Sequence, residues 1–261
     1  MKKVVRIIFL IFSIFLIFVF ILGIFENRIE RIIGKGFLEK KKIGEKFTLI
    51  FQINYLDFIP MGISSYHFEG LSLYKEEQAY LIRGEAEDTF PFSLFKPARA
   101  KFTSYLDTSD MLPLYLHSRI EMDRKLKREN EIIYHQKENY MISKGEKYVI
   151  FYPTYEPLSL IFYLMRDDFD MHKSQELNLN SNQANYTVKI EVKDKREYNV
   201  KGENYTIWEV ALSVKRRKGE IMRHSMDIKA YFLKDSQMNI PLLVKAYTNV
   251  GSVLIRLTDL N

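Results

Sequence analysis

The stretch TIWEVALSV, residues 206–214, alternates apolar and polar side chains along most of its length. Every second residue from Trp208 to Val214 is apolar, and these residues share one face of an extended chain, because successive side chains of a strand point to opposite sides of a sheet. Such an alternation is typical of a strand with one buried face and one face in water. The stretch therefore predicts antiparallel β-structure.

The same period of two recurs through most of the chain after residue 44. The runs are KFTLIFQIN (46–54), LPLYLHSRI (112–120), NYTVKIEV (185–192), residues 221–233, and two closing runs, 240–248 and 252–260. The more charged stretch 123–147 fits exposed hairpin strands. Many strands in succession predict a sandwich or a barrel. We expect a mainly β fold, a single curved antiparallel sheet or barrel-like β-roll with one short packed helix, preceded by an N-terminal transmembrane helix.

The composition limits the classes of protein that fit the chain. The 261 residues are 47% hydrophobic, enough for a core, and include no cysteine, which excludes disulfides, thiol catalysis and thiolate metal sites. The net charge of +6 falls to +3 without Lys2, Lys3 and Arg6, which precede the first apolar run. A balance this small and scattered predicts no nucleic-acid partner, although it permits contact with anionic lipid.

Residues 7–25, IIFLIFSIFLIFVFILGIF, contain only Ser13 and Gly23 besides Ile, Leu, Phe and Val. A helix of this length covers about 28 Å, close to the thickness of a bilayer core. A cleaved signal peptide is the alternative, but its apolar part is shorter and its cleavage site needs small residues. We therefore expect a retained transmembrane anchor or signal-anchor in residues 1–25. The basic residues before it favour a single-pass protein of the inner (cytoplasmic) membrane, with most of the chain in the periplasm or otherwise outside the cytoplasm.

Residues 26–43 link this anchor to the rest of the chain. Ile29, Ile32 and Ile33 fall on one side of a helix with charges between them, and glycines follow. We expect a short amphipathic juxtamembrane linker, with a lipid sensor as the alternative. Residues 44–261 then form one antiparallel β domain, since no repeat or proline-rich linker divides them.

One segment breaks the β pattern. In PLSLIFYLMR, residues 157–166, apolar side chains recur at the spacing of a helical face and cover most of the circumference. Pro157 fits the first helical turn, where its missing N–H is harmless. Because a helix this short is unstable alone, we expect it to pack against, or plug, one end of the interior of the sheet.

Three aspartates, Asp167, Asp168 and Asp170, follow this helix. The helix dipole disfavours negative charge at this end by about 0.3–1 kcal/mol each. We expect compensation from Arg166, from a lysine of a neighbouring strand, or from exposure to water. Two interpretations stay open: a solvated rim loop, which we favour, and a cation site that uses the carboxylates without the glycine of a calcium loop.

Four segments together resemble a known family of bacterial envelope proteins, domain of unknown function 3108. They are GEKFTLIFQINYLDFIPMG (44–62), DTSDMLP (107–113), PLSLIFYLMR (157–166) and IPLLVKAYTNVGSVLIRLTDL (240–260). The resemblance implies a highly curved, barrel-like antiparallel sheet with a helix packed on it. It matches Tyr163 and Arg166 to the end of the family's helix and brings no catalytic residue. Many members have a cleavable signal where this chain has its long apolar run.

No motif for catalysis stands out. The five histidines lack paired ligand spacing, no serine has the glycines of a nucleophile elbow, and no phosphate-binding glycine loop is present. Arg216, Arg217 and Lys218 fit a solvated hairpin tip, with contact to phosphate headgroups as the alternative. The sequence predicts no catalytic residue, no metal and no cofactor, and it leaves the ligand-binding residues unassigned.

Three classes of function remain. The first is a non-enzymatic protein whose curved sheet binds an apolar ligand such as a lipid, suggested by the anchor and the many aromatic and methionine side chains. The second is a structural or adaptor component of envelope assembly that binds another envelope protein. The third, a hydrolase, has no motif in its favour. We favour the first, so the expected partners are the inner membrane, through residues 7–25, and a lipid or another envelope protein.

Overall fold

The structure is a computed structural model. It describes residues 29–30, 32–33, 45–90, 93, 97–171, 173–217, 226–235, 237–248 and 251–261. The expected anchor, residues 1–25, and most of the expected linker lie outside the described residues, as do Lys218, His172 and His224. Within the described residues, no helix is both long and apolar enough to cross a membrane.

All fifteen strands of the described chain belong to one sheet. They are β1 (Phe47–Tyr55), β2 (Ile59–Tyr74), β3 (Glu77–Asp88), β4 (Ala98–Asp107), β5 (Pro113–Met122), β6 (Lys125–His135), β7 (Tyr140–Ser143), β8 (Glu146–Val149), β9 (Thr154–Tyr155), β10 (Ser174–Ser181), β11 (Ala184–Val200), β12 (Glu203–Arg216), β13 (Met226–Lys234), β14 (Asn239–Thr248) and β15 (Gly251–Leu260). Their order is β8-β7-β6-β5-β4-β3-β2-β1-β15-β14-β13-β12-β11-β10-β9. Every neighbouring pair is antiparallel except β9 and β10.

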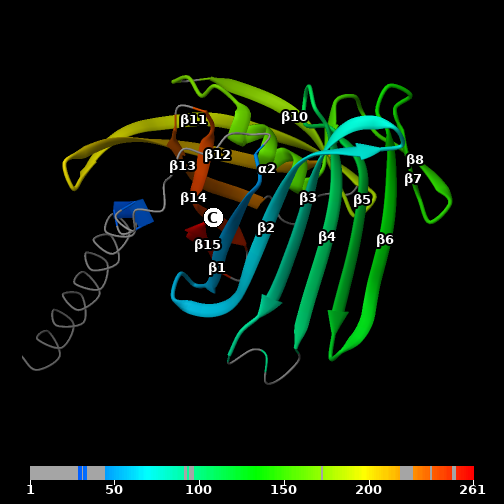
Figure 1. Cartoon of the computed structure of the whole chain (residues 1–261), viewed down its shortest axis with the longest axis horizontal. Helices are drawn as coiled ribbons and strands as arrows, with labels where there is room; N and C mark the ends of the chain where they lie inside the picture. The colour runs from blue at the N-terminus through cyan, green and yellow to red at the C-terminus, as the bar shows by residue number, and fades with distance from the viewer. Residues whose placement is uncertain are drawn as a thin grey trace, which may run out of the picture.

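The sheet consists of two meanders that meet at the first and last strands. Strands β1 to β8 follow one another on one side of the junction, and β15 back to β9 follow on the other. At the junction β1 pairs with β15, and Thr48 and Asn261 exchange backbone hydrogen bonds of 2.7 and 3.0 Å. Figure 1 shows the two halves running in different directions, with the helix α2 between them. The halves thus enclose a concave space.

The two edges of the sheet approach each other without pairing as strands. They are β8 and β9, which are consecutive in the chain. The amide of Gln136 takes the place of a strand pair, because Nε2 donates to Thr154 O at 2.8 Å and Oε1 accepts from Thr154 N at 3.1 Å. Nearby, Asn185 Nδ2 donates to Val149 O at 2.7 Å. The sheet is therefore a strongly curved, open half-barrel and not a closed barrel, with side chains holding the seam between β8 and β9.

The expected helix, α2 (Pro157–Arg166), lies inside the concave space. The ring of Phe162 stacks on Phe68 of β2 at 5.4 Å, whereas Leu160 and Leu164 belong to a second cluster with residues of β11 to β13. Its buried apolar side chains contribute about 1.5–3 kcal/mol each as an upper estimate. Packing against both halves therefore supplies the stability that ten isolated residues lack.

A short helical piece of the linker is also described. Ile29, Ile32 and Ile33 are at most 2% exposed, whereas Glu30 is exposed. The three isoleucines belong to the same hydrophobic cluster as Tyr231 of β13. The apolar side of this piece is thus part of the core of the β domain.

The hydrogen bonds of Gln136 allow a test of how much the seam between β8 and β9 stabilises the fold. Gln136→Ala removes both hydrogen bonds to Thr154 and a third to Pro113 O at 3.3 Å. We expect urea-induced unfolding of the full chain to show a loss of about 1–3 kcal/mol in the free energy of unfolding. The exposed Gln78→Ala on β3 is the matched control and should change it by less than about 0.5 kcal/mol. Equal effects of the two substitutions would show that the seam adds no stability.

Candidate functional site

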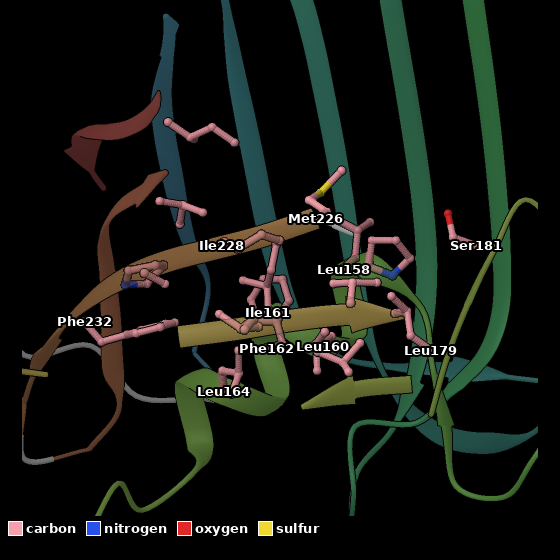
Figure 2. A pocket seen from close by; sticks show the side chains of 18 of the residues that line it. Leu158, Leu160, Ile161, Phe162, Leu164, Leu179, Ser181, Met226, Ile228 and Phe232 are labelled. Carbon is pink, nitrogen blue, oxygen red and sulfur yellow. The ribbon is translucent and has the colours of Figure 1, made fainter. Parts of the chain in front are cut away.

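An apolar cavity of about 670 Å³ lies between α2 and the concave face of the sheet. Its walls come from α2, from strands β10 to β15 and from β1 and β2. In Figure 2, Ile161 and Phe162 of the helix face Ile228 of β13. Among the described residues no charged side chain lines the cavity; its polar lining consists of Ser181 and three tyrosines. The helix packs inside the sheet, as expected, but leaves this space unfilled.

Strand β13 shows how the sequence builds an uncharged wall. Ile228, Ala230 and Phe232 line the cavity. Lys229 lies between them on the other face, where its Nζ is 3.2 Å from Glu209. Because side chains alternate along a strand, the period of two sends apolar residues inward and charges outward.

The cavity has an open end at which it meets solvent. Leu164 and Phe232 lie toward one end, and Ser181 and Met226 toward the other (Figure 2). Ser181 is the last residue of β10 and Met226 the first of β13. The side chain of Met226 is 40% exposed, so the cavity meets solvent at these strand ends.

Glu156 holds the buried N-terminus of α2. Its carboxylate accepts hydrogen bonds from the backbone N–H of Leu158 at 2.8 Å and of Ser159 at 2.9 Å, and from Ser104 Oγ at 3.2 Å. In return, Ser159 Oγ accepts from the backbone N–H of Glu156 at 2.8 Å. This reverses the usual capping box, in which the hydroxyl side chain comes first. The helix donors are thereby satisfied inside the core.

Glu156 and Tyr134 are two buried ionisable residues of this core, and the charge of one affects the pKa of the other. Burial raises the pKa of Glu156 to about 7. Its hydrogen bonds with Leu158, Ser159 and Ser104 favour the ionised form and lower the pKa, but their effect is smaller than that of burial. Burial also raises the pKa of Tyr134 well above its usual value, and the charge of Glu156 adds to this. Within the described chain the Tyr134 hydroxyl has no hydrogen-bond partner. Neither side chain lines the cavity, so both belong to the scaffold around it.

The residues matched to the family's helix anchor that helix. Tyr163 Oη donates to Gln175 Oε1 at 3.2 Å. Arg166 Nη1 donates to the carbonyl oxygens of Thr108 at 3.3 Å and Ser109 at 2.9 Å, in the turn between β4 and β5. Neither Tyr163 nor Arg166 lines the cavity. Their role in the structure is to fix the end of α2.

The aspartates after the helix find cationic partners. Asp167 accepts from Lys173 Nζ at 2.8 Å, and Asp168 from Lys234 Nζ at 2.9 Å. The hydrogen bond from Lys234 lowers the pKa of Asp168. Asp170 is exposed. In the part of the chain that the structure describes, no three acidic or histidine side chains are grouped to hold a metal ion.

Sequence reasoning missed two residues that position the helix. They are Glu156 and Asn239. Asn239 Nδ2 donates to Leu164 O at 3.2 Å and also to Asp167 O, and so binds the C-terminal end of α2. For Glu156 a usable signal existed, because an acceptor directly before Pro157 with Ser159 three positions later is a mirrored capping pattern. For Asn239 no local pattern exists, since its contacts span more than 70 residues of sequence.

The comparisons with known proteins agree with this fold. The family model "Protein of unknown function (DUF3108)" matches residues 48–258. A crystal structure of a beta-barrel-like protein of domain of unknown function DUF1849 from Brucella abortus is similar with a TM-score of 0.56 at 11% identity. The match covers 83% of this chain and 97% of that one. At this identity the similarity shows a shared fold alone.

Two further structures are less similar to this chain. A "putative lipoprotein" of Parabacteroides distasonis has a TM-score of 0.35 at 9% identity, covering 84% of this chain and 97% of that one. A "putative exported protein" with a YmcC-like fold, from Bacteroides fragilis, has a TM-score of 0.32 at 9% identity, covering 86% and 98%. No curated protein matches the chain.

The buried carboxyl predicts a dependence of stability on pH. The pKa of Glu156 rises from 4.5 to about 7 on folding, so the folded state holds this proton more tightly than the unfolded state. Its contribution to stability is complete below pH 4.5 and is lost as the pH rises through about 7. At about 1.4 kcal/mol per pH unit, the free energy of unfolding should fall by about 3 kcal/mol.

Urea unfolding of wild type and Glu156→Gln between pH 4.5 and 8 isolates this term. The difference between the two proteins should change with pH, because the amide does not titrate. Glu138→Gln, exposed in the turn between β6 and β7, is the control and should follow wild type at every pH. A constant difference between wild type and Glu156→Gln would contradict the raised pKa.

Proposed function

The chain belongs to the DUF3108 family, whose function is unknown, and from its cavity we propose that it is a non-enzymatic protein that binds an apolar ligand such as a lipid. The observation that carries this proposal is the lining of the cavity, which is apolar except for one serine and three tyrosines and has no charged side chain among the described residues. A polar ligand would leave its own groups without partners there. A hydrocarbon chain would not.

The size of the cavity suits such a ligand. Its volume of about 670 Å³ falls within the ~300–1,000 Å³ common for small-molecule sites. Each methylene moved from water into it is worth about 0.8 kcal/mol. Ten methylenes give roughly 8 kcal/mol, which corresponds to a micromolar dissociation constant before the costs of ordering the ligand.

We place the protein at the inner membrane, held through residues 7–25, with the β domain outside the cytoplasm. The apolar run of this segment supports the placement. A tether there would keep the open end of the cavity within reach of membrane lipid.

The geometry gives less support to the two other classes of function. An adaptor that recruits a partner strand needs a free sheet edge, but Gln136 and Asn185 already occupy the backbone groups of Thr154 and Val149 at the two edges. A hydrolase needs a base beside its nucleophile. Ser181 has none, since no histidine or carboxylate of the described chain lines the cavity.

Filling the cavity should abolish binding. Ala230→Phe places a ring into the cavity, whereas Ala211→Phe places one on the opposite face, cross-strand from Lys229. Native mass spectrometry of the full chain purified from membranes should show bound lipid for wild type and Ala211→Phe, and a loss of at least tenfold for Ala230→Phe. Urea unfolding checks that each variant is folded. If Ala230→Phe does not fold, Val214→Trp, nearer the open end of the cavity, serves as the second cavity-filling variant.

Two outcomes would contradict this function. Undiminished lipid in both cavity-filling variants would place the ligand elsewhere on the protein. Wild-type protein free of lipid, and unable to take up added hexadecanoate, would reject binding altogether.

A further inference from the structure

Two rows of cross-strand partners lead from the cavity onto the inner wall of the first half of the sheet. One row runs from Tyr66 through Gly84, Phe102 and Ser118 to Asn130. The other runs from Phe51 through Ser64, Ala86, Ala100 and Ile120 to Arg128. Tyr66 and Phe51 line the cavity. Since directly opposed residues of a sheet point to the same side, both rows lie on the concave face.

Four small residues, Gly84, Ala86, Ala100 and Ser118, lie in the middle of these rows beside the larger Phe102 and Ile120, and we refer to this strip of the inner wall as the trough. Ala86, Ala100 and Ser118 are partly exposed. At Gly84 a Cβ atom would lie 3.1 Å from the ring of Tyr66, so the glycine lets this ring lie against the sheet where the cavity meets the trough. The trough therefore begins next to the cavity residue Tyr66, on the same face of the sheet.

The trough ends at Arg128, a partly buried arginine on β6. With the amide of Asn130 oriented toward it, the Asn130 oxygen accepts from Arg128 Nε at 2.7 Å and from Nη2 at 3.1 Å. Asn130 itself is 6% exposed. Within the described chain no carboxylate pairs with Arg128. A partly desolvated guanidinium held only by a neutral amide retains most of its capacity to bind an anion.

On the outer face of the same strands, arginine and lysine side chains have acidic partners. Arg119 of β5 lies 2.8 Å from Glu121, and Arg99 and Lys101 both contact Glu85. These cations are neutralised by their neighbours and face away from the cavity. Arg128 is distinguished from them both by its face and by its lack of an acidic partner in the described chain.

We propose that the trough and Arg128 form a head-group subsite, and that the ligand is a single-chain amphiphile with an anionic head. This inference rests on the proposed function. Four strand spacings of about 4.8 Å separate Tyr66 from Asn130, roughly 19 Å along the sheet. The tail fills the cavity, the first part of the ligand lies along the trough, and the carboxylate or phosphate of the head binds the guanidinium through paired N–H donors.

A competition between two lipids of equal chain length tests the subsite. Delipidated full chain receives an equimolar mixture of an anionic lysophosphatidylglycerol and the uncharged monoacylglycerol, and native mass spectrometry gives the ratio bound. We expect a preference of about tenfold for the anionic lipid in wild type and none in Arg128→Gln. Arg119→Gln, on the outer face, is the matched control and should keep the preference. Excess inorganic phosphate should not remove it, because phosphate without a tail lacks the contacts of the cavity.

The outcomes separate the subsite from the function on which it rests. Arg128→Gln that keeps the tenfold preference would overturn the subsite while leaving apolar binding intact. Arg216 is cross-strand from the cavity residue Tyr186. If Arg216→Gln loses the preference and Arg128→Gln keeps it, the head group binds at Arg216, and the proposal is overturned. Displacement by phosphate would make Arg128 a site for free phosphate. Failure of both lipids to bind would reject the proposed function itself.

Discussion

A helix enclosed by a sheet has to satisfy its terminal N–H and C=O groups without bulk water, and the rest of this structure is arranged around that constraint. Glu156 accepts from the first N–H groups and is fixed in turn by Ser104 of β4. Asn239, the first residue of β14, binds the last carbonyls. The two ends of α2 are therefore tied to opposite halves of the sheet. Apolar packing has no direction. We therefore infer that the hydrogen bonds at the two ends of α2, and not its apolar side chains, fix the position of the helix. This position leaves a cavity between the helix and the sheet.

The second organising feature is the separation of charge between the faces of the sheet. Lysine, arginine and glutamate side chains of the outer face pair with one another, as Lys229 does with Glu209, and such exposed pairs add little stability. The inner face carries apolar side chains under the helix and, beyond it, small residues beside Phe102 and Ile120. Arg128 departs from this rule on the inner wall, which is why its chemistry, more than that of any exposed cation, bears on the ligand. Sequence position alone would not distinguish it from its charged neighbours.

The fold could be predicted from the sequence further than the site could. The alternation in 221–233 correctly placed Met226, Ile228 and Phe232 on one face, and the helix has the bounds expected from PLSLIFYLMR. Both patterns are local, so a single segment reveals them. The cavity is not local, because its volume depends on how far two halves of a sheet stand apart. The position of Arg128 on the inner face could not be predicted from local sequence either. The register between β5 and β6 shifts between Ile120 and Glu121, opposite Arg128 and Leu126.

The pairing of β1 with β15 has a consequence for how the chain reaches this state. Each half can form from hairpins between neighbouring segments, which is fast, whereas the junction joins residues about 200 positions apart and carries a high contact order. Until the last strand has been synthesised, β1 presents unpaired backbone groups, and such an edge invites pairing with other chains. The register shift of this junction lies on β15, where Thr258 is the extra residue opposite Ile50 and Phe51, so β1 presents a regular, uninterrupted edge during that interval.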